Sequence, residues 1–233
     1  MATANRGGVI GFEQRSVLES PIKKMERPSA LGGAFKRLFD VTAATVILLM
    51  LTPLCLFTAT AIWITSGAPV LYGHERIGLG GRRFRCWKFR TMSSNSAEIL
   101  RRHLEHDDAA RAEWSASRKL RRDPRITRFG SVLREYSVDE LPQLLNVILG
   151  DMSLVGPRPV VEDELSYYGK KVEAYFSARP GITGLWQVSG RSDTDYARRV
   201  EFDAEYVRSW SLGRDMRILL RTVPAVLGAR GSY

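Results

Sequence analysis

Cysteine and histidine are scarce in this chain of 233 residues, which has two cysteines and three histidines. Their spacing does not resemble a zinc site, and two cysteines are too few for a disulfide framework. Cys55 lies in an apolar run and Cys86 in a predicted strand, so the sequence favours free thiols and a reducing compartment. Internal repeats and long low-complexity tracts are absent as well.

Negative charge is also in short supply. The sequence has 25 acidic residues against 35 lysines and arginines, which gives a formal net charge of +10. A surplus of this size favours anionic partners: nucleic acid, phosphorylated small molecules or an anionic membrane surface. Composition alone does not choose among them. A chain of this length buries one sizeable core, so we expect one domain with appendages.

One long segment lacks charge of either sign and runs from Val41 to Gly73. Its core, 41–65, exceeds the roughly 20 residues with which a helix crosses the apolar part of a bilayer. A buried soluble helix of this length is the less favoured interpretation, so the sequence predicts a membrane segment. Pro53 lies near the middle and removes one helical hydrogen bond, which indicates a break or kink.

Basic residues lie on both sides of this apolar segment. Lys36 and Arg37 precede it, and six lysines and arginines follow between Arg76 and Arg90. Because positive charge favours the cytoplasmic side of a membrane, we expect both ends on that side. A re-entrant helix–break–helix hairpin satisfies this expectation. A kinked spanning helix is the alternative that the pattern leaves open.

We therefore expect three parts along the chain: a mostly disordered lead-in at 1–33, a membrane hairpin at 34–67 and a cytosolic domain with interfacial helices at 68–233. The lead-in shows neither apolar periodicity nor the short apolar region of a secretory signal. The expected fold class is α+β and mostly helical, with a membrane-embedded re-entrant helix and one small β-hairpin.

Alternation of side chains predicts the β-hairpin. Residues 68–72 form one expected strand, 77–81 a flexible glycine-rich loop, and 84–90 a second strand of alternating apolar and basic residues. The period of two places Arg85 and Lys88 on opposite faces of that strand.

Periodicity and glycine content predict three further elements: a charged helix or helical hairpin at 94–120, a helix at 127–135 and a glycine-punctuated loop at 179–191. The loop offers Gln187 and Arg191 as recognition groups. The last segment, 212–227, has an apolar side and an arginine side. It either lies in the membrane interface, with its arginines among lipid phosphates, or packs on the core with a solvated basic face.

Two adjacent carboxylates, Asp139 and Glu140, stand among these basic residues. The simplest interpretation is a capping box, with Ser137 as N-cap and Glu140 reaching back. Pro142 argues against it, because proline fits best at the first position of a helix. In either register the carboxylates lie at the positive end of a helix and near arginines, which predicts a lowered pKa for the aspartate.

An ionised carboxylate can attack a phosphorus centre, and a second carboxylate beside it can hold Mg²⁺. Nearby arginines would neutralise the charge that otherwise repels such a nucleophile from phosphate. On spacing alone, however, helix capping stays the simpler interpretation of the pair.

Four motifs in order resemble the bacterial sugar transferases, the monotopic polyprenyl-phosphate phosphoglycosyl transferases. They are Lys88–Met92, Leu133–Val147, Gly150–Pro159 and Arg179–Gln187. The resemblance runs from about Phe35 to the end of the chain. In detail it is greatest to the rhizobial-type exopolysaccharide galactosyl-1-phosphate transferases.

The resemblance implies a two-step transfer that initiates exopolysaccharide synthesis. Asp139 would attack the sugar-bearing phosphate of a UDP-hexose and expel UMP; polyprenyl phosphate would then take the phosphosugar. Glu140 matches the Mg²⁺-associated acid. Galactose is favoured, with glucose next. The residues expected to bind substrate or phosphate are Lys88, Arg90, Arg134, Arg158, Gln187 and Arg191.

The resemblance also implies a monotopic protein on the cytosolic face of the inner membrane, with membrane lipid as a partner and no nucleic acid. Its re-entrant helix would break at Thr52-Pro53, where the family has a Ser-Pro pair. Threonine can bond back to a carbonyl of the preceding turn and bend the helix. The sequence leaves the oligomeric state open, a homo-oligomer included.

Two other functions fit part of the pattern. A non-catalytic membrane adaptor would bind anionic lipid or nucleic acid through its arginines and would need neither Mg²⁺ nor the carboxylate pair. A glycosyltransferase using the same UDP-sugar would release UDP in place of UMP.

Overall fold

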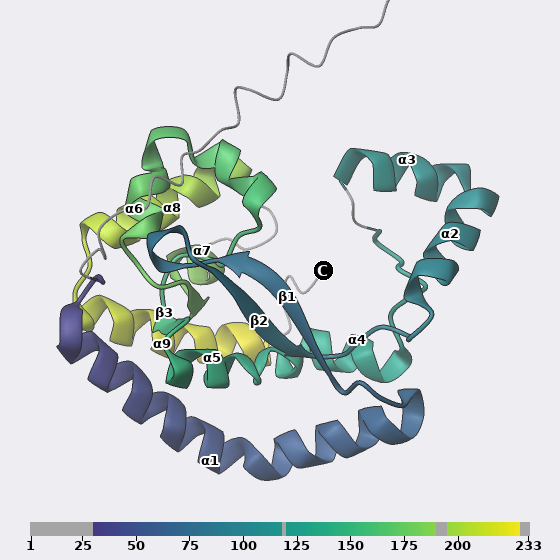
Figure 1. Ribbon diagram of the computed structural model, residues 1–233, viewed down its shortest axis with the longest axis horizontal. Helices are drawn as coiled ribbons and strands as arrows, with labels where there is room; N and C mark the ends of the chain where they lie inside the picture. The colour runs from purple at the N-terminus through teal and green to yellow at the C-terminus, as the bar shows by residue number, and fades with distance from the viewer. Residues whose placement is uncertain (1–29, 118–119, 190–194, 229–233) are drawn as a thin grey trace, which may run out of the picture.

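The computed structural model describes residues 30–117, 120–189 and 195–228. Helices surround two small two-stranded sheets, and the long helix α1 runs beneath this body (Figure 1). The prediction of a mostly helical α+β fold is confirmed. Most of the predicted lead-in lies outside the described residues. Its last part does not fit disorder, because Leu31 packs against the main hydrophobic core.

Helix α1 (Gly33–Ser66) is the one described helix that is long and apolar enough to cross a membrane. The sequence predicts an interruption at Thr52-Pro53, but the helix continues through Pro53. Proline removes one hydrogen bond without ending the helix, and the Thr52 hydroxyl donates to the Leu48 carbonyl at 2.8 Å. The predicted break is therefore a bend: α1 arcs so that both of its ends approach the body (Figure 1).

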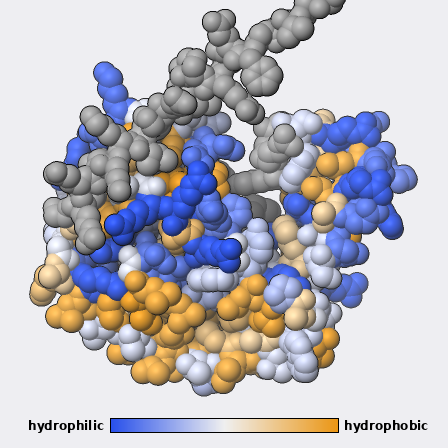
Figure 2. Space-filling model, viewed as in Figure 1, coloured by the Kyte–Doolittle hydropathy of each residue, from blue (hydrophilic) through white to orange (hydrophobic). Residues whose placement is uncertain are grey.

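The outer face of α1 is apolar and uncovered. Leu49, Met50, Phe57 and Ile64 are each between 66 % and 74 % exposed. Apolar residues predominate along the lower edge of the molecule in Figure 2, where α1 lies. An apolar surface of this extent marks a contact with a partner or a membrane.

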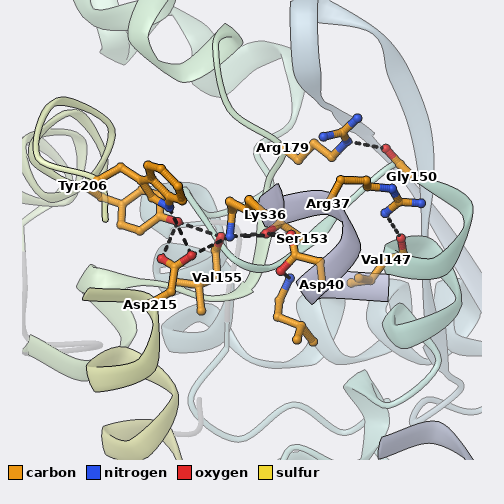
Figure 3. A network of polar contacts seen from close by, with 12 residues as sticks. Lys36, Arg37, Asp40, Val147, Gly150, Ser153, Val155, Arg179, Tyr206 and Asp215 are labelled. Atoms are coloured by element: carbon orange, nitrogen blue, oxygen red, sulfur yellow. Dashed lines mark hydrogen bonds and ion pairs between the residues drawn. The ribbon is translucent and has the colours of Figure 1, made fainter. Parts of the chain in front are cut away.

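The first turns of α1 are fixed to the body by buried polar contacts (Figure 3). Lys36 Nζ donates to Asp215 Oδ2 at 2.7 Å, and the Ser153 hydroxyl donates to Asp40 Oδ2 at 2.7 Å. Arg37 donates to the carbonyl oxygens at the end of α5 (Gln143–Leu149). Buried charges are costly unless they are paired, so this network sets where α1 meets the body.

The last turns of α1 are fixed as well. Ile62 packs with Phe89 and Leu133 in a small apolar cluster. The Arg90 guanidinium donates to the carbonyl oxygens of Ser66 and Gly67, at 2.6 and 2.5 Å, which the end of a helix leaves unpaired. Both arms of α1 are thus attached to the same body.

Strands β1 (Leu71–Ile77) and β2 (Arg83–Phe89) form an antiparallel hairpin in which Tyr72 lies opposite Lys88. The hairpin is confirmed, but its first strand was predicted at 68–72. The error arose because polar residues follow Tyr72 in the sequence, and the structure nevertheless pairs them with the whole of β2. A 3₁₀ turn, Leu79–Gly81, joins the strands.

The second sheet pairs β3 (Ser153–Val155) with β4 (Gly181–Thr183) in parallel. The predicted loop at 179–191 is therefore wrong, since it contains β4 and helix α7 (Leu185–Ser189). Its glycines allow two backbones to approach: a Cβ added to Gly181 would lie 2.1 Å from the Gly156 nitrogen. Glycine in a strand often marks such close approach.

The remaining helices complete the body. Helices α2 (Ser96–His106) and α3 (Asp108–Ser117) form the predicted charged hairpin, which projects to one side (Figure 1). The predicted helices near 127–135 and at 212–227 are confirmed as α4 (Arg128–Glu135) and α9 (Leu212–Leu227). The others are η3 (Glu162–Lys171), α6 (Val172–Phe176) and α8 (Tyr196–Arg208).

Candidate active site

Asp139 and Glu140, here called the acidic dyad, lie in the 3₁₀ turn η2 (Val138–Glu140) between α4 and α5. The capping-box interpretation is wrong, because the Ser137 side chain makes no capping bond in the described chain. Pro142 instead directly precedes α5. Ser137 has a left-handed backbone, with φ 55° and ψ 21°. This conformation costs a non-glycine residue on the order of 1 kcal/mol and is often found beside functional groups.

Lys88 of β2 joins both members of the dyad. Its Nζ lies 2.6 Å from Glu140 Oε1 and 3.7 Å from Asp139 Oδ2. The Asp139 side chain is only 10 % exposed, whereas those of Glu140 and Lys88 are 34 % and 35 % exposed. The structure thus brings three predicted site residues together, with the aspartate innermost.

The predicted lowering of the Asp139 pKa is wrong in direction. The pKa of Asp139 is raised to about 6, mainly by burial and in part by the neighbouring Glu140, while Lys88 and Arg134 oppose the change. Burial penalises the charged form, and here it outweighs the cations. Asp139 is still mainly ionised at neutral pH, and as a carboxylate of raised pKa it is a stronger nucleophile than an ordinary aspartate.

Glu140 and Lys88 form the opposite case. Burial by itself would raise the pKa of Glu140, but the ion pair with Lys88 holds it below its usual value, and Arg158 and Arg76 add to this effect. Burial by itself would likewise lower the pKa of Lys88, and the dyad raises it. Glu140 therefore stays ionised and Lys88 protonated across the neutral range.

Asn146 of α5 determines where β2 lies. Its side-chain amide donates to the Arg85 carbonyl at 2.8 Å and accepts from the Trp87 N–H at 3.0 Å. Asn146 is fully buried, so these bonds lock β2, and with it Lys88, against α5. Asn146 was not among the predicted site residues. A polar side chain inside the apolar run 144–149 was the available signal.

Arg134 approaches the dyad from α4. Its Nε donates to Thr91 Oγ1 at 2.8 Å. The half-buried guanidinium also interacts electrostatically with Asp139. This interaction raises the pKa of Arg134, but burial lowers that pKa by more. Arg134 is therefore placed where the sequence predicted a cation beside the dyad.

A second group of arginines surrounds Trp186. Arg158 and Arg199 both lie over its ring, at 5.1 and 4.2 Å from the centroid. The pKa of Arg199 is lowered, first by burial and then by the charge of Arg158; the same two causes lower that of Arg76. A cluster of cations of this kind attracts anions. Arg199 and Arg76 were not among the predicted substrate-binding residues.

Other predicted residues have different places. Arg90 points to the end of α1, as described above, so the structure does not bring it to the dyad. Gln187 lies half-buried on α7 beside Trp186. Arg191 falls outside the described residues.

The acidic dyad offers carboxylate ligands for magnesium. Within residues 30–117, 120–189 and 195–228, no three histidine, cysteine or acidic side chains gather as a metal cluster. Mg²⁺ does not need one, since it usually binds one or two carboxylates and completes its shell with water and substrate phosphates. The partly exposed carboxylate of Glu140 can serve in this way, so the residues present fit a magnesium shared with a phosphorylated substrate.

An ionised, nearly buried aspartate with a lysine, several arginines and a carboxylate for a metal is suited to group transfer at phosphate. An apolar helix attached at both ends adds contact with a membrane. The fold and site therefore define the class of membrane-associated transferases. Residues 31–229 match the family described as bacterial sugar transferase, and the chain belongs to that family of enzymes.

Curated relatives agree with this assignment. The exopolysaccharide production protein ExoY of Rhizobium meliloti is 53 % identical over 203 residues, which cover 87 % of this chain and 90 % of that protein. The undecaprenyl-phosphate galactose phosphotransferase of Salmonella typhimurium is 50 % identical over 85 % of this chain and 41 % of its own length. The UDP-glucose:undecaprenyl-phosphate glucose-1-phosphate transferase of Caulobacter vibrioides is 43 % identical over 85 % and 72 %.

Proposed function

We propose that this enzyme transfers hexose-1-phosphate from a UDP-hexose to polyprenyl (undecaprenyl) phosphate and so initiates exopolysaccharide synthesis. In the first step an Asp139 carboxylate oxygen attacks the sugar-bearing phosphorus. The bond to UMP breaks, and UMP leaves with the electron pair. In the second step an oxygen of polyprenyl phosphate attacks the same phosphorus, which releases Asp139 as a carboxylate and yields the polyprenyl-diphospho-sugar.

The observation that carries this proposal is the position of Asp139. It is buried enough to be poorly solvated, and it has a cation 3.7 Å away that offsets its charge. Desolvation strengthens a carboxylate nucleophile, and fixed cations allow it to approach an anionic substrate.

The other residues have supporting roles in the proposal. Lys88 and Arg134 hold the reacting phosphate near Asp139, and Arg158 holds the second phosphate together with Arg199. Glu140 would hold Mg²⁺, which when bound neutralises diphosphate charge. Trp186 keeps the two arginines in place by offering them its ring faces, a favourable contact for guanidinium groups.

Galactose is the favoured hexose. The Salmonella relative is named for galactose and the Caulobacter relative for glucose, and the chain is more similar to the first. The site as described distinguishes neither sugar directly, so the choice follows this similarity.

The attachment of α1 supports a re-entrant rather than a spanning arrangement. Because both arms are fixed to one body, we place that body on the cytosolic face of the inner membrane, with α1 dipping into one leaflet. The proposed parts are the lead-in 1–33, the membrane helix 34–67 and the catalytic domain 68–233.

Product analysis tests the chemistry. Purified enzyme with polyprenyl phosphate and a panel of UDP-sugars is expected to release UMP, most rapidly from UDP-galactose, and to need Mg²⁺. With UDP-sugar alone, acid-quenched enzyme is expected to carry a phosphosugar on Asp139 by mass spectrometry. Asp139→Asn is expected to abolish both results, while Asp163→Asn, at an exposed aspartate of η3, should change neither. Release of UDP, or full activity of Asp139→Asn, contradicts the proposal.

Labelling tests the topology. Single cysteines at Ala34 and Arg82, both exposed and at opposite ends of the membrane segment, are introduced into a chain carrying Cys55→Ser and Cys86→Ala. Both positions should react with an impermeant maleimide only after the cytoplasmic side is opened. Reaction of one of them from outside would require a spanning helix.

A further inference from the structure

A groove with a basic wall lies along α9, apart from the acidic dyad. Its volume is about 360 Å³, within the range of small-ligand sites. It is lined by Leu185, Ser209, Ser211, Arg214, Arg217, Ile218 and Arg221. Helix α9 is held firmly in place, because Ile218 is buried and Thr222 Oγ1 lies 2.8 Å from Thr183 Oγ1. The wall is therefore a fixed surface.

Two of the three arginines have no acidic partner in the described part of the chain. Arg214 pairs with Glu205 at 2.5 Å. Arg217 and Arg221 are exposed, and neither takes part in any ion pair seen among the described residues. They stand four positions apart on one helix, where like charges repel each other and weaken the helix. An anion between them would remove that repulsion.

The neighbouring strip of α9 is apolar and exposed. Met216, Leu220 and Val223 are 41 %, 69 % and 58 % exposed. At about 100° per residue, Leu220 lies roughly 60° around the helix from Arg217 and roughly 100° from Arg221, so the apolar strip borders the arginine side at Arg217. The opposite side, with Asp215 and Ile218, is buried in the body. This order of surfaces is typical of a helix in a membrane interface, with its arginines at the depth of the headgroups.

We propose that the groove along α9 binds the headgroup of an anionic phospholipid, with Arg217 and Arg221 contacting its phosphate. The acyl chains would then lie along the apolar strip, which explains why phosphate-binding arginines and exposed apolar side chains occur together. A soluble phosphate would use the arginines and leave the strip exposed to water. A zwitterionic lipid would cover the strip but would carry its own cation to the two arginines.

This site includes none of the residues assigned to phosphate transfer, and it does not depend on that assignment. Each basic residue near an anionic lipid surface adds roughly a factor of five in affinity. Removal of two should therefore weaken the binding of anionic lipid about 25-fold.

The experiment uses the full-length chain in neutral detergent, titrated with dihexanoyl phosphatidylglycerol. Native mass spectrometry counts bound lipid, and thermal unfolding provides a second measurement. The wild-type chain should hold one phosphatidylglycerol more tightly than dihexanoyl phosphatidylcholine. Arg217→Gln/Arg221→Gln should lose this preference, and Arg217→Lys/Arg221→Lys should keep most of it. The matched control is Arg121→Gln/Arg122→Gln, which removes the same charge from an exposed loop and should bind like wild type.

Three results would overturn the proposal. Equal binding of both lipids by the wild-type chain would mean that the strip alone makes the contact. Displacement of phosphatidylglycerol by millimolar inorganic phosphate would mean that the groove is a site for soluble anions. An equal loss in the Arg121/Arg122 control would mean that net charge, and not the groove, attracts the lipid. The lipid preference of the wild-type chain needs no variant, so misfolding of a variant leaves the first two tests decisive.

Discussion

Lys88 is predicted to act on the charge state of Asp139, and the change Lys88→Met isolates that effect. Methionine keeps most of the length of the side chain and removes its charge. The variant leaves two adjacent carboxylates without the cation that lies 2.6 Å from one and 3.7 Å from the other. Both carboxylates should then be harder to ionise.

The magnitude follows from the geometry. An opposite charge within about 4–6 Å lowers an aspartate pKa by roughly 1–3 units, and because Lys88 is 35 % exposed, solvent screening favours the lower half of that range. Its loss should raise the pKa of Asp139 from about 6 to roughly 7–8. With a pKa near 8, the ionised fraction at pH 7 falls from about nine-tenths to roughly one-tenth. At pH 9 both proteins are mainly ionised.

The assay is single-turnover UMP release at saturating UDP-hexose between pH 6 and 9. Lys88→Met should be slower by up to about tenfold at pH 7 and should approach wild type at pH 9, so that its profile moves to higher pH by roughly 1–2 units. Lys88→Arg should keep the wild-type profile. Lys170→Met, at an exposed lysine of η3, is the matched control. A loss of equal size at pH 7 and pH 9 would refute the reasoning, because Lys88 would then act only by holding the phosphate and not on the charge of Asp139.

Three further predictions concern stability, measured by thermal unfolding in detergent. Because the folded-state pKa of Asp139 rises from 3.8 to about 6, the folded protein binds more protons than the unfolded chain between those values, and stability falls as the pH rises through that window. Asp139→Asn should therefore stabilise the protein at pH 7 by up to about 3 kcal/mol and have little effect near pH 4; a lower Tm at pH 7 would contradict this. Asn146→Ala should destabilise by about 2–4 kcal/mol, since it leaves the Arg85 carbonyl and the Trp87 N–H unpaired in the interior; an unchanged Tm would show that water replaces the amide. Gly156→Ala should cost about 1–3 kcal/mol, because its Cβ would lie 2.3 Å from the Arg179 carbonyl oxygen. Gly213→Ala, whose Cβ meets nothing within 4 Å, should not destabilise and serves as its control.

Local patterns predicted much of the fold. The charge-free run gave α1, alternation gave the β-hairpin, and helical spacing gave α9 at its observed bounds. The errors lie where contacts distant in sequence decide the structure. Strand β4 forms because Gly181 can approach Gly156, and a stretch rich in glycine and proline gives no sign of that partner.

The sequence predicts which residues form the site better than it predicts their pKa values. The dyad, Lys88, Arg134 and Arg158 could be named from motifs, yet the pKa of Asp139 was predicted in the wrong direction. Spacing reveals which charges are near in sequence, but the extent of burial depends on the whole fold. Arg90 shows the same limit. Lys88 and Arg90 belong to one motif, yet the motif does not indicate that Lys88 faces the dyad while Arg90 binds the carbonyl oxygens at the end of α1.

The pairing of Lys36 with Asp215 has a consequence for biosynthesis. The two residues are 179 positions apart, and a ribosome that adds about 5–20 residues per second needs roughly 10–35 seconds to make the intervening chain. In the proposed arrangement, an α1 that enters the lipid during synthesis does so with Asp40, one turn away, as the partner of Lys36. Asp215 would then complete the pairing only after the rest of the chain has been made, when the body folds against the inserted helix.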